Sequence, residues 1–170
     1  MKIIKKLVSV DGTEKYLFAL SDGNVVEGVF MKNDYGNTQC LSTQVGCRMG
    51  CSFCASGLDG LFRNLTPSEM LAQITKAQQD NNIRISNVVM MGMGEPLDNF
   101  DNSVRFLQLV SNEKGLGIGL RHISLSTSGV VSGIEKLKGY NFPITLSVSL
   151  HAPNDQIRTS MMKVNKKWNI

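Results

Sequence analysis

The chain has 170 residues, of which 42% are hydrophobic and 19% charged, and its formal net charge is +4 at pH 7. This balance is ordinary for a globular domain with a sizeable core, and it excludes a disordered or fibrous chain. No apolar run is long enough for a signal peptide or a transmembrane helix, so we expect a cytoplasmic protein with no membrane partner. In that reducing compartment, four cysteines favour metal binding or redox chemistry over structural disulfides.

Alternating, β-branched sequence characterises the first part of the chain. The dipeptides Asp11-Gly12 and Asp22-Gly23 interrupt it, and both are strong hairpin turn signals. The segments predicted to be strands are 15–20, 25–30 and 39–43. Residues 1–42 are therefore expected to form a small antiparallel β unit.

Three closely spaced cysteines follow this unit, in a CxxxCxxC pattern: Cys47, Cys51 and Cys54. A structural zinc site needs four ligands, and a closed iron-sulfur cluster likewise takes four cysteines. Three cysteines leave one iron of a 4Fe-4S cluster open to a small molecule. The spacing thus favours an open-iron cluster, and a zinc site completed by Cys40 or a histidine is the alternative interpretation.

Beyond the cysteines, helices and strands are expected to alternate. Thr66 is a helix cap, Pro67 suits the first helical position, and Glu69 completes a capping box. One face of this first helix carries Met70, Leu71, Ile74 and Ala77. The later strands are expected at 85–91, 122–126 and 144–150, and the later helices at 100–110 and 131–138. This alternation predicts a parallel sheet with right-handed crossovers, in a second unit over residues 43–170.

Three polar segments follow the predicted strands, at the sheet edge where ligands usually bind. They are 92–97, 124–129 and 147–155. In the first, glycines allow a ligand to approach the backbone, and Glu95 can accept bonds from an ammonium group. Each segment also has a purely structural interpretation: a glycine turn with a solvated glutamate, a helix cap, and a structural His151.

The cysteine pattern, with Phe53 before its last cysteine, resembles the signature of radical S-adenosylmethionine (SAM) enzymes. The segments that narrow this resemblance are 44–47, 92–97, 126–131 and 149–155. In this order and at these intervals they resemble the RlmN-type dual-specificity adenine-C2 methyltransferases of 23S rRNA and tRNA. The resemblance extends from about Val26 to Ile170 and implies an α/β fold, a partial (βα) radical-SAM barrel preceded by the antiparallel unit.

The resemblance also implies cofactors and ligand positions. The three cysteines of the CxxxCxxC pattern would hold a 4Fe-4S cluster, SAM would chelate its open iron, and an electron donor would reduce it. The positions that match the family's SAM-binding residues are Gly94, Glu95, Ser126, Ser149, Leu150 and His151. Radical chemistry then belongs to the cofactors, while the protein positions them and excludes water.

Two further positions match the family's catalytic residues. Glu27 corresponds to the acid that accepts a proton from the methylated adenine carbon, and Cys40 to a cysteine that forms a transient disulfide. Without the resemblance, an exposed strand glutamate and a buried, inert thiol would be the preferred interpretations.

The sequence departs from the family in several places. No cysteine follows Cys54, so the methyl-carrying cysteine is missing, as are the later barrel strands and the helical amino-terminal region. We therefore expect a truncated methyltransferase that cannot turn over alone. Three lysines near the end, Lys163, Lys166 and Lys167, suit RNA phosphates or a solvated face. The alternatives are an adenine-C8 methyltransferase, which Pro96 disfavours, and a non-catalytic zinc-binding RNA module.

Overall fold

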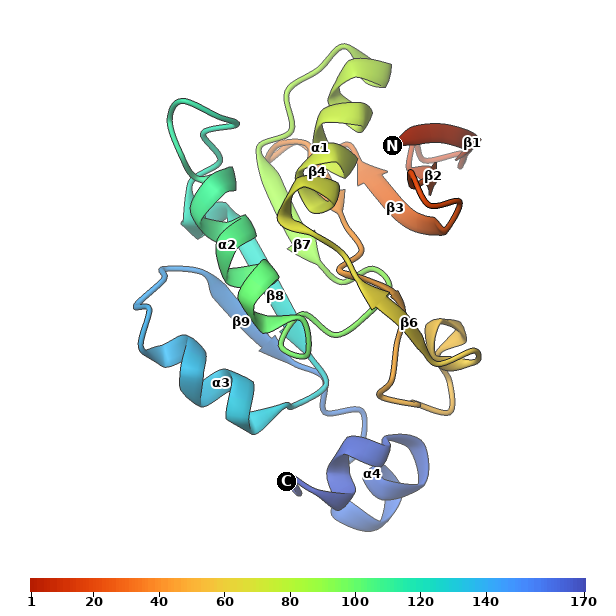
Figure 1. The fold of residues 1–170 in the computed structure, drawn as a ribbon, viewed down its shortest axis with the longest axis vertical. Helices are drawn as coiled ribbons and strands as arrows, with labels where there is room; N and C mark the ends of the chain where they lie inside the picture. The colour runs from red at the N-terminus through yellow and green to blue at the C-terminus, as the bar shows by residue number, and fades with distance from the viewer.

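A seven-stranded sheet runs through the protein, whose residues 1–170 are all described by a computed structural model (Figure 1). Its strands lie in the order β1-β2-β3-β4-β7-β8-β9. They are β1 (Lys2–Val8), β2 (Glu14–Ala19), β3 (Val25–Met31), β4 (Thr38–Cys40), β7 (Asn87–Met90), β8 (Ile123–Thr127) and β9 (Thr145–Val148). Strands β1 to β4 pair antiparallel, whereas β4, β7, β8 and β9 pair parallel. The predicted α/β fold, with antiparallel strands preceding parallel ones, is confirmed.

Both predicted hairpin turns are present. Gly12 and Gly23 have φ angles of +82° and +86°, which favour glycine because it lacks a Cβ. In each turn the preceding aspartate, Asp11 or Asp22, accepts a hydrogen bond from the backbone N–H two residues later. Strand β1 was not predicted, because most of its side chains are exposed and three of its seven residues, in KIIKKLV, are lysines.

Strand β4 joins the two parts of the sheet. Cys40 lies opposite Val29 of β3 in the antiparallel register and opposite Val89 of β7 in the parallel one. The segment predicted as the last strand of the antiparallel unit therefore also begins the parallel part. As a result, the carboxyl end of β4 lies beside that of β7 and at the same edge of the sheet as that of β8.

Three α-helices follow the expected alternation: α1 (Pro67–Asn81), α2 (Phe100–Val110) and α3 (Val131–Lys138). A fourth helix, α4 (Asp155–Met161), was not predicted. Figure 1 shows α1 and α2 crossing in front of the sheet. The predicted capping box of α1 is present: the Thr66 hydroxyl accepts from Glu69 N at 3.3 Å, and the Glu69 carboxylate accepts from Thr66 N at 2.9 Å. None of the helices combines the length and apolar character needed to cross a bilayer.

The two faces of the parallel strands differ. Val88, Met90, Ile123 and Leu125 are buried in the core with apolar residues of α1 and α2. The alternate residues, such as Ser124 and Ser126, are only partly buried, and on the other side of the sheet no helix covers them. We call this second side the open face.

A second, two-stranded sheet carries the cysteine loop. Strands β5 (Gln44–Gly46) and β6 (Leu61–Asn64) pair antiparallel, and between them lie the three cysteines and a short 3₁₀ helix, Ala55–Gly57. This hairpin was not predicted. Figure 1 shows it beside the end of the sheet from which α4 also extends.

Candidate functional site

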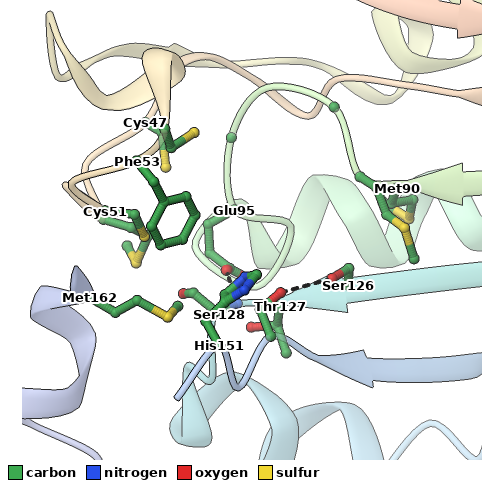
Figure 2. A pocket seen from close by; sticks show the side chains of 16 residues that line it. Cys47, Cys51, Phe53, Met90, Glu95, Ser126, Thr127, Ser128, His151 and Met162 are labelled. Carbon is green, nitrogen blue, oxygen red and sulfur yellow. Dashed lines mark hydrogen bonds between the residues drawn. The ribbon is translucent and has the colours of Figure 1, made fainter. Parts of the chain in front are cut away.

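A cavity of about 340 Å³ lies where β7, β8 and β9 end (Figure 2). Most of the predicted ligand residues line it: Cys47, Cys51, Cys54, Gly94, Glu95, Ser126, Ser149 and His151. Glu27, Cys40 and Leu150 do not. The structure therefore brings together residues from three strand ends and from the cysteine loop, which are separated by up to about a hundred positions in the sequence.

Backbone contacts hold the cysteine loop against two neighbours. Cys47 N donates to Gly60 O at 2.9 Å, and Ser52 N donates to Met161 O at 2.9 Å. Gly46 has a φ of +74°, and a Cβ there would lie 2.0 Å from Gly60 O, so only glycine fits. The loop is thus anchored to the β5–β6 hairpin on one side and to the end of α4 on the other.

The four cysteines are all free thiols, so the disulfide implied for Cys40 is not found. Cys40 lies on β4, outside the cavity that holds the other three cysteines. Burial raises the pKa of Cys47 to about 11. Burial, and next the charge of the neighbouring Cys54, also raise the pKa of Cys51. Thiols in this environment stay protonated until a metal displaces the proton.

The donor set of this loop fits a 4Fe-4S cluster. Such a cluster takes its thiolates on separate irons, and three from one loop leave the fourth iron free for another ligand. No three His, Cys, Asp or Glu side chains converge closely enough to surround a single metal ion.

The glycines of the 92–97 segment allow residues 41–44 of the chain to pack closely against them. A Cβ on Gly92 would lie 2.7 Å from Leu41 O, and one on Gly94 would lie 2.6 Å from the Gln44 Cβ. Gly94 also has a φ of +100°. The chain before the cysteine loop thus packs against these glycines where a side chain would otherwise stand, and both glycines also line the cavity.

Glu95 is a buried carboxylate, and each of its two oxygens accepts a hydrogen bond from a backbone N–H. It is 3% exposed, its Oε1 accepts from Leu97 N at 3.0 Å, and its Oε2 accepts from Ser128 N at 2.7 Å. Its own N–H donates to Gln44 Oε1 at 2.9 Å. It forms no ion pair with a cation of the chain. The solvated-glutamate interpretation is wrong, and the carboxylate keeps lone pairs for a cationic ligand.

The serines at the ends of β8 and β9 lie together. Ser126 Oγ and Ser149 Oγ are 3.4 Å apart, and Ser149 N donates to Thr127 O at 2.9 Å. The hydroxyl of Thr127, rather than that of Ser126, accepts from the backbone N–H groups of residues 129 and 130 ahead of α3. Ser126 is therefore not needed as a helix cap, and its side chain lines the cavity.

His151 and Phe53 contact each other in the wall of the cavity. Their ring centroids are 4.8 Å apart in an edge-on arrangement. Figure 2 shows both side chains among those that line the cavity. His151 has a φ of +58°, an uncommon conformation for a residue with a side chain. The aromatic residue of the cysteine pattern thus packs on the histidine that follows β9, so the two segments form one wall.

Arg158 is a site residue that the sequence did not reveal. It lies on α4, is 3% exposed and has no carboxylate partner. Its guanidinium donates to Ser128 O at 2.6 Å, to Ser149 O and Leu150 O at 3.2 Å, and to Asn165 Oδ1 at 2.7 Å. Arg158 therefore ties together the loops that follow β8 and β9. No sequence signal distinguished it, since α4 itself was not predicted.

Glu27 and Cys40 lie outside the cavity but on the same open face as Ser126. Cys40 lies opposite Val29 of β3, and Glu27 is two residues before Val29, so Glu27 and Cys40 point to the same side of the sheet. Cys40 also lies opposite Val89 of β7, which lies opposite Ser124 of β8. Ser126 is two residues after Ser124 and therefore points to this side as well. The Glu27 side chain is 46% exposed and pairs with Lys15 Nζ at 2.8 Å. Burial raises the pKa of Cys40. The open face thus extends from the cavity to both residues.

The chain is similar to known proteins over almost its whole length. The family profile "Radical SAM superfamily" matches residues 41–169. The chain is 56% identical to "Probable dual-specificity RNA methyltransferase RlmN" of Clostridium novyi over 99% of its length, and 57% identical to the protein of that name in Alkaliphilus oremlandii over its whole length. It covers 49% and 50% of those proteins, so it spans about half their length.

A solved structure shows the same fold. A radical SAM methyltransferase from Sphaerobacter thermophilus superposes with a TM-score of 0.92 at 42% identity, over 99% of this chain and 51% of that one. The cysteine pattern, the parallel sheet and the family profile lead to one assignment. The chain belongs to the radical SAM superfamily.

Proposed function

We propose that this chain forms the SAM-binding and SAM-cleaving part of an RNA adenine-C2 methyltransferase. The observation that carries the proposal is one cavity lined by three free thiols of a single loop and by a fixed, unpaired carboxylate, Glu95. The names of the relatives, which are RNA methyltransferases, support the RNA substrate. The family resemblance specifies 23S rRNA and tRNA.

In this proposal each group of the cavity has one task. Cys47, Cys51 and Cys54 hold the 4Fe-4S cluster, and Glu95 receives the ammonium group of SAM. Ser126, Ser149 and His151 contact the rest of the ligand. With an external electron donor, the bound cluster and SAM would supply the radical chemistry. The cavity also has methionine side chains in its walls, Met49, Met90, Met91 and Met162, which exclude water from the reaction.

The adenine would lie along the open face. Glu27 would accept the proton from the adenine carbon, and Cys40 would supply its thiol to resolve the covalent intermediate. Both side chains share this face with Ser126, which supports a substrate position between them and the cavity. The 170 residues contain no cysteine after Cys54, so the share of the reaction that we propose for these residues is the binding and cleavage of SAM.

Anaerobic reconstitution with iron and sulfide tests the proposal. We expect roughly four irons per chain and broad absorption at about 400 nm, and after addition of dithionite the conversion of SAM to 5′-deoxyadenosine and methionine. Cys51→Ser should lose both signals, whereas Cys40→Ser, outside the cavity, should retain them. A colourless zinc-loaded protein, or a cluster that does not cleave SAM, would contradict the proposal. Mass spectrometry of adenine-containing RNA incubated with the chain should detect neither 2-methyladenosine nor 8-methyladenosine.

A further inference from the structure

Ser128 has a buried hydroxyl without a hydrogen-bond partner. The residue is 9% exposed, lines the cavity, and its Oγ is one of two buried side-chain polar atoms left unpaired in the whole chain. Leaving a buried hydroxyl unpaired is unfavourable, and such groups are rare in native proteins. An unpaired hydroxyl in the wall of a ligand cavity therefore indicates a partner that arrives with the ligand.

Hydrogen bonds of its own backbone hold Ser128 in place. Ser128 N donates to Glu95 Oε2 at 2.7 Å, and Ser128 O accepts from Arg158 Nη2 at 2.6 Å. The residue is thus held between a carboxylate on one side and a guanidinium on the other. Figure 2 shows Ser128 close to Glu95 and His151 in the wall of the cavity.

Neither of the charged residues on either side of Ser128, Glu95 and Arg158, forms an ion pair within the protein. Glu95 forms no ion pair with a cation, and Arg158 forms none with a carboxylate, although each is 3% exposed. Buried charges usually have a partner of opposite sign. A ligand with an ammonium and a carboxylate group on one carbon would complement both charges at once.

Arg158 cannot bind that carboxylate with its own donors. A guanidinium has five N–H groups, and these are directed to the oxygens of Ser128, Ser149, Leu150, Asn165 and Trp168. The hydroxyl beside it, on Ser128, is the free donor. Arg158 therefore acts through its charge and by positioning Ser128, while the hydrogen bond comes from serine.

We propose that Ser128 donates a hydrogen bond to the α-carboxylate of SAM, so that Glu95 and Ser128 together recognise the amino-acid end of the ligand. This inference rests on the proposed function. Ser128 lies in the polar segment 124–129 predicted from the sequence, but within that segment the family resemblance implied only Ser126 as a ligand residue. The two serines would contact different parts of the ligand. Ser128 would contact the amino-acid end, and Ser126, on the open face, would contact another part.

Calorimetric titration of the cluster-loaded, unreduced 170-residue protein with SAM and with 5′-methylthioadenosine tests whether Ser128 contacts the amino-acid end. Ser128→Ala should weaken SAM binding about tenfold, the order expected for one hydrogen bond to a charged acceptor. The same variant should bind 5′-methylthioadenosine, which lacks the amino-acid end, as well as the unsubstituted protein does. Ser160→Ala is the matched control, because its hydroxyl bonds only Ile157 O on the exposed side of α4. It should bind both ligands normally.

The stability of the Ser128→Ala protein separates a ligand role from a structural one. No hydrogen bond of the side chain is lost, so its free energy of unfolding without ligand should not fall. Unchanged SAM affinity, equal weakening of both ligands, or a destabilised fold would each overturn the assignment to Ser128. Failure of the unsubstituted protein to bind SAM would instead overturn the proposed cofactor site, and with it this inference.

Discussion

Arg158→Met removes a buried guanidinium while nearly preserving the volume of the side chain. The backbone carbonyls of Ser128, Ser149 and Leu150 and the side-chain oxygen of Asn165 then lose their donor. A buried acceptor left without a partner costs about 1–3 kcal/mol. The two short bonds, to Ser128 at 2.6 Å and Asn165 at 2.7 Å, set the scale of the loss.

The gain from no longer burying an unpaired cation partly offsets this loss. We therefore expect a net decrease in the free energy of unfolding of about 2–4 kcal/mol, a large part of the ~5–15 kcal/mol that stabilises an ordinary domain. Urea denaturation followed by circular dichroism measures it. Arg105→Met is the matched control, because that arginine is exposed on α2 and its side chain bonds only Gln108. Its effect should stay within about 0.5 kcal/mol.

The location of the effect is as informative as its size. Amide hydrogen exchange should accelerate in the loops after β8 and β9, which Arg158 joins, before it changes in α1. If Arg158→Met were no more destabilising than Arg105→Met, the guanidinium would not be what holds these loops together. Arg158 would then not be the residue that positions the cavity wall.

Three further predictions concern other parts of the structure. Thr66→Ala should lower the free energy of unfolding by about 1 kcal/mol, because it removes the α1 cap, whereas Thr66→Ser should retain most of it. Gly94→Ala should destabilise by about 1–3 kcal/mol and abolish SAM binding, since φ is +100° and its Cβ meets Gln44 at 2.6 Å; the unstrained Gly119→Ala should do neither. The hydrogen bond from Arg63 lowers the pKa of Glu69 below its ordinary 4.5. That stabilisation is present above pH 4.5 and is lost as the pH falls through the folded-state pKa, so the advantage of the unsubstituted protein over Glu69→Gln in urea unfolding should shrink below about pH 4.5.

Local signals in the sequence were sufficient for most of the parallel part. Helix α1 was predicted from its cap and its apolar periodicity, and α2 and α3 were observed with the predicted bounds. The position of the site also followed from the sequence, because the carboxyl ends of neighbouring parallel strands must meet at one edge. The predicted residues Glu95, Ser126 and His151 accordingly lie around one cavity with the cysteines.

Elements without a strong local pattern were missed. Strand β1 exposes most of its side chains, so it lacks the alternation that burial imposes. Helix α4 has only seven residues, and its one buried side chain is the charged Arg158. The β5–β6 hairpin encloses the cysteine loop, whose glycines and cysteines obscure any strand signal.

The amino-acid sequence by itself determined the donor chemistry: three thiols at CxxxCxxC spacing and a carboxylate in a glycine-rich turn. Residue type and spacing along the chain carry that information, because they set which bonds a segment can make. Only the tertiary structure decided which polar atoms remain unpaired. Glu95, Ser128 and Arg158 are separated in sequence, and their charges and hydrogen bonds become complementary to a ligand only when three loops pack into one buried wall.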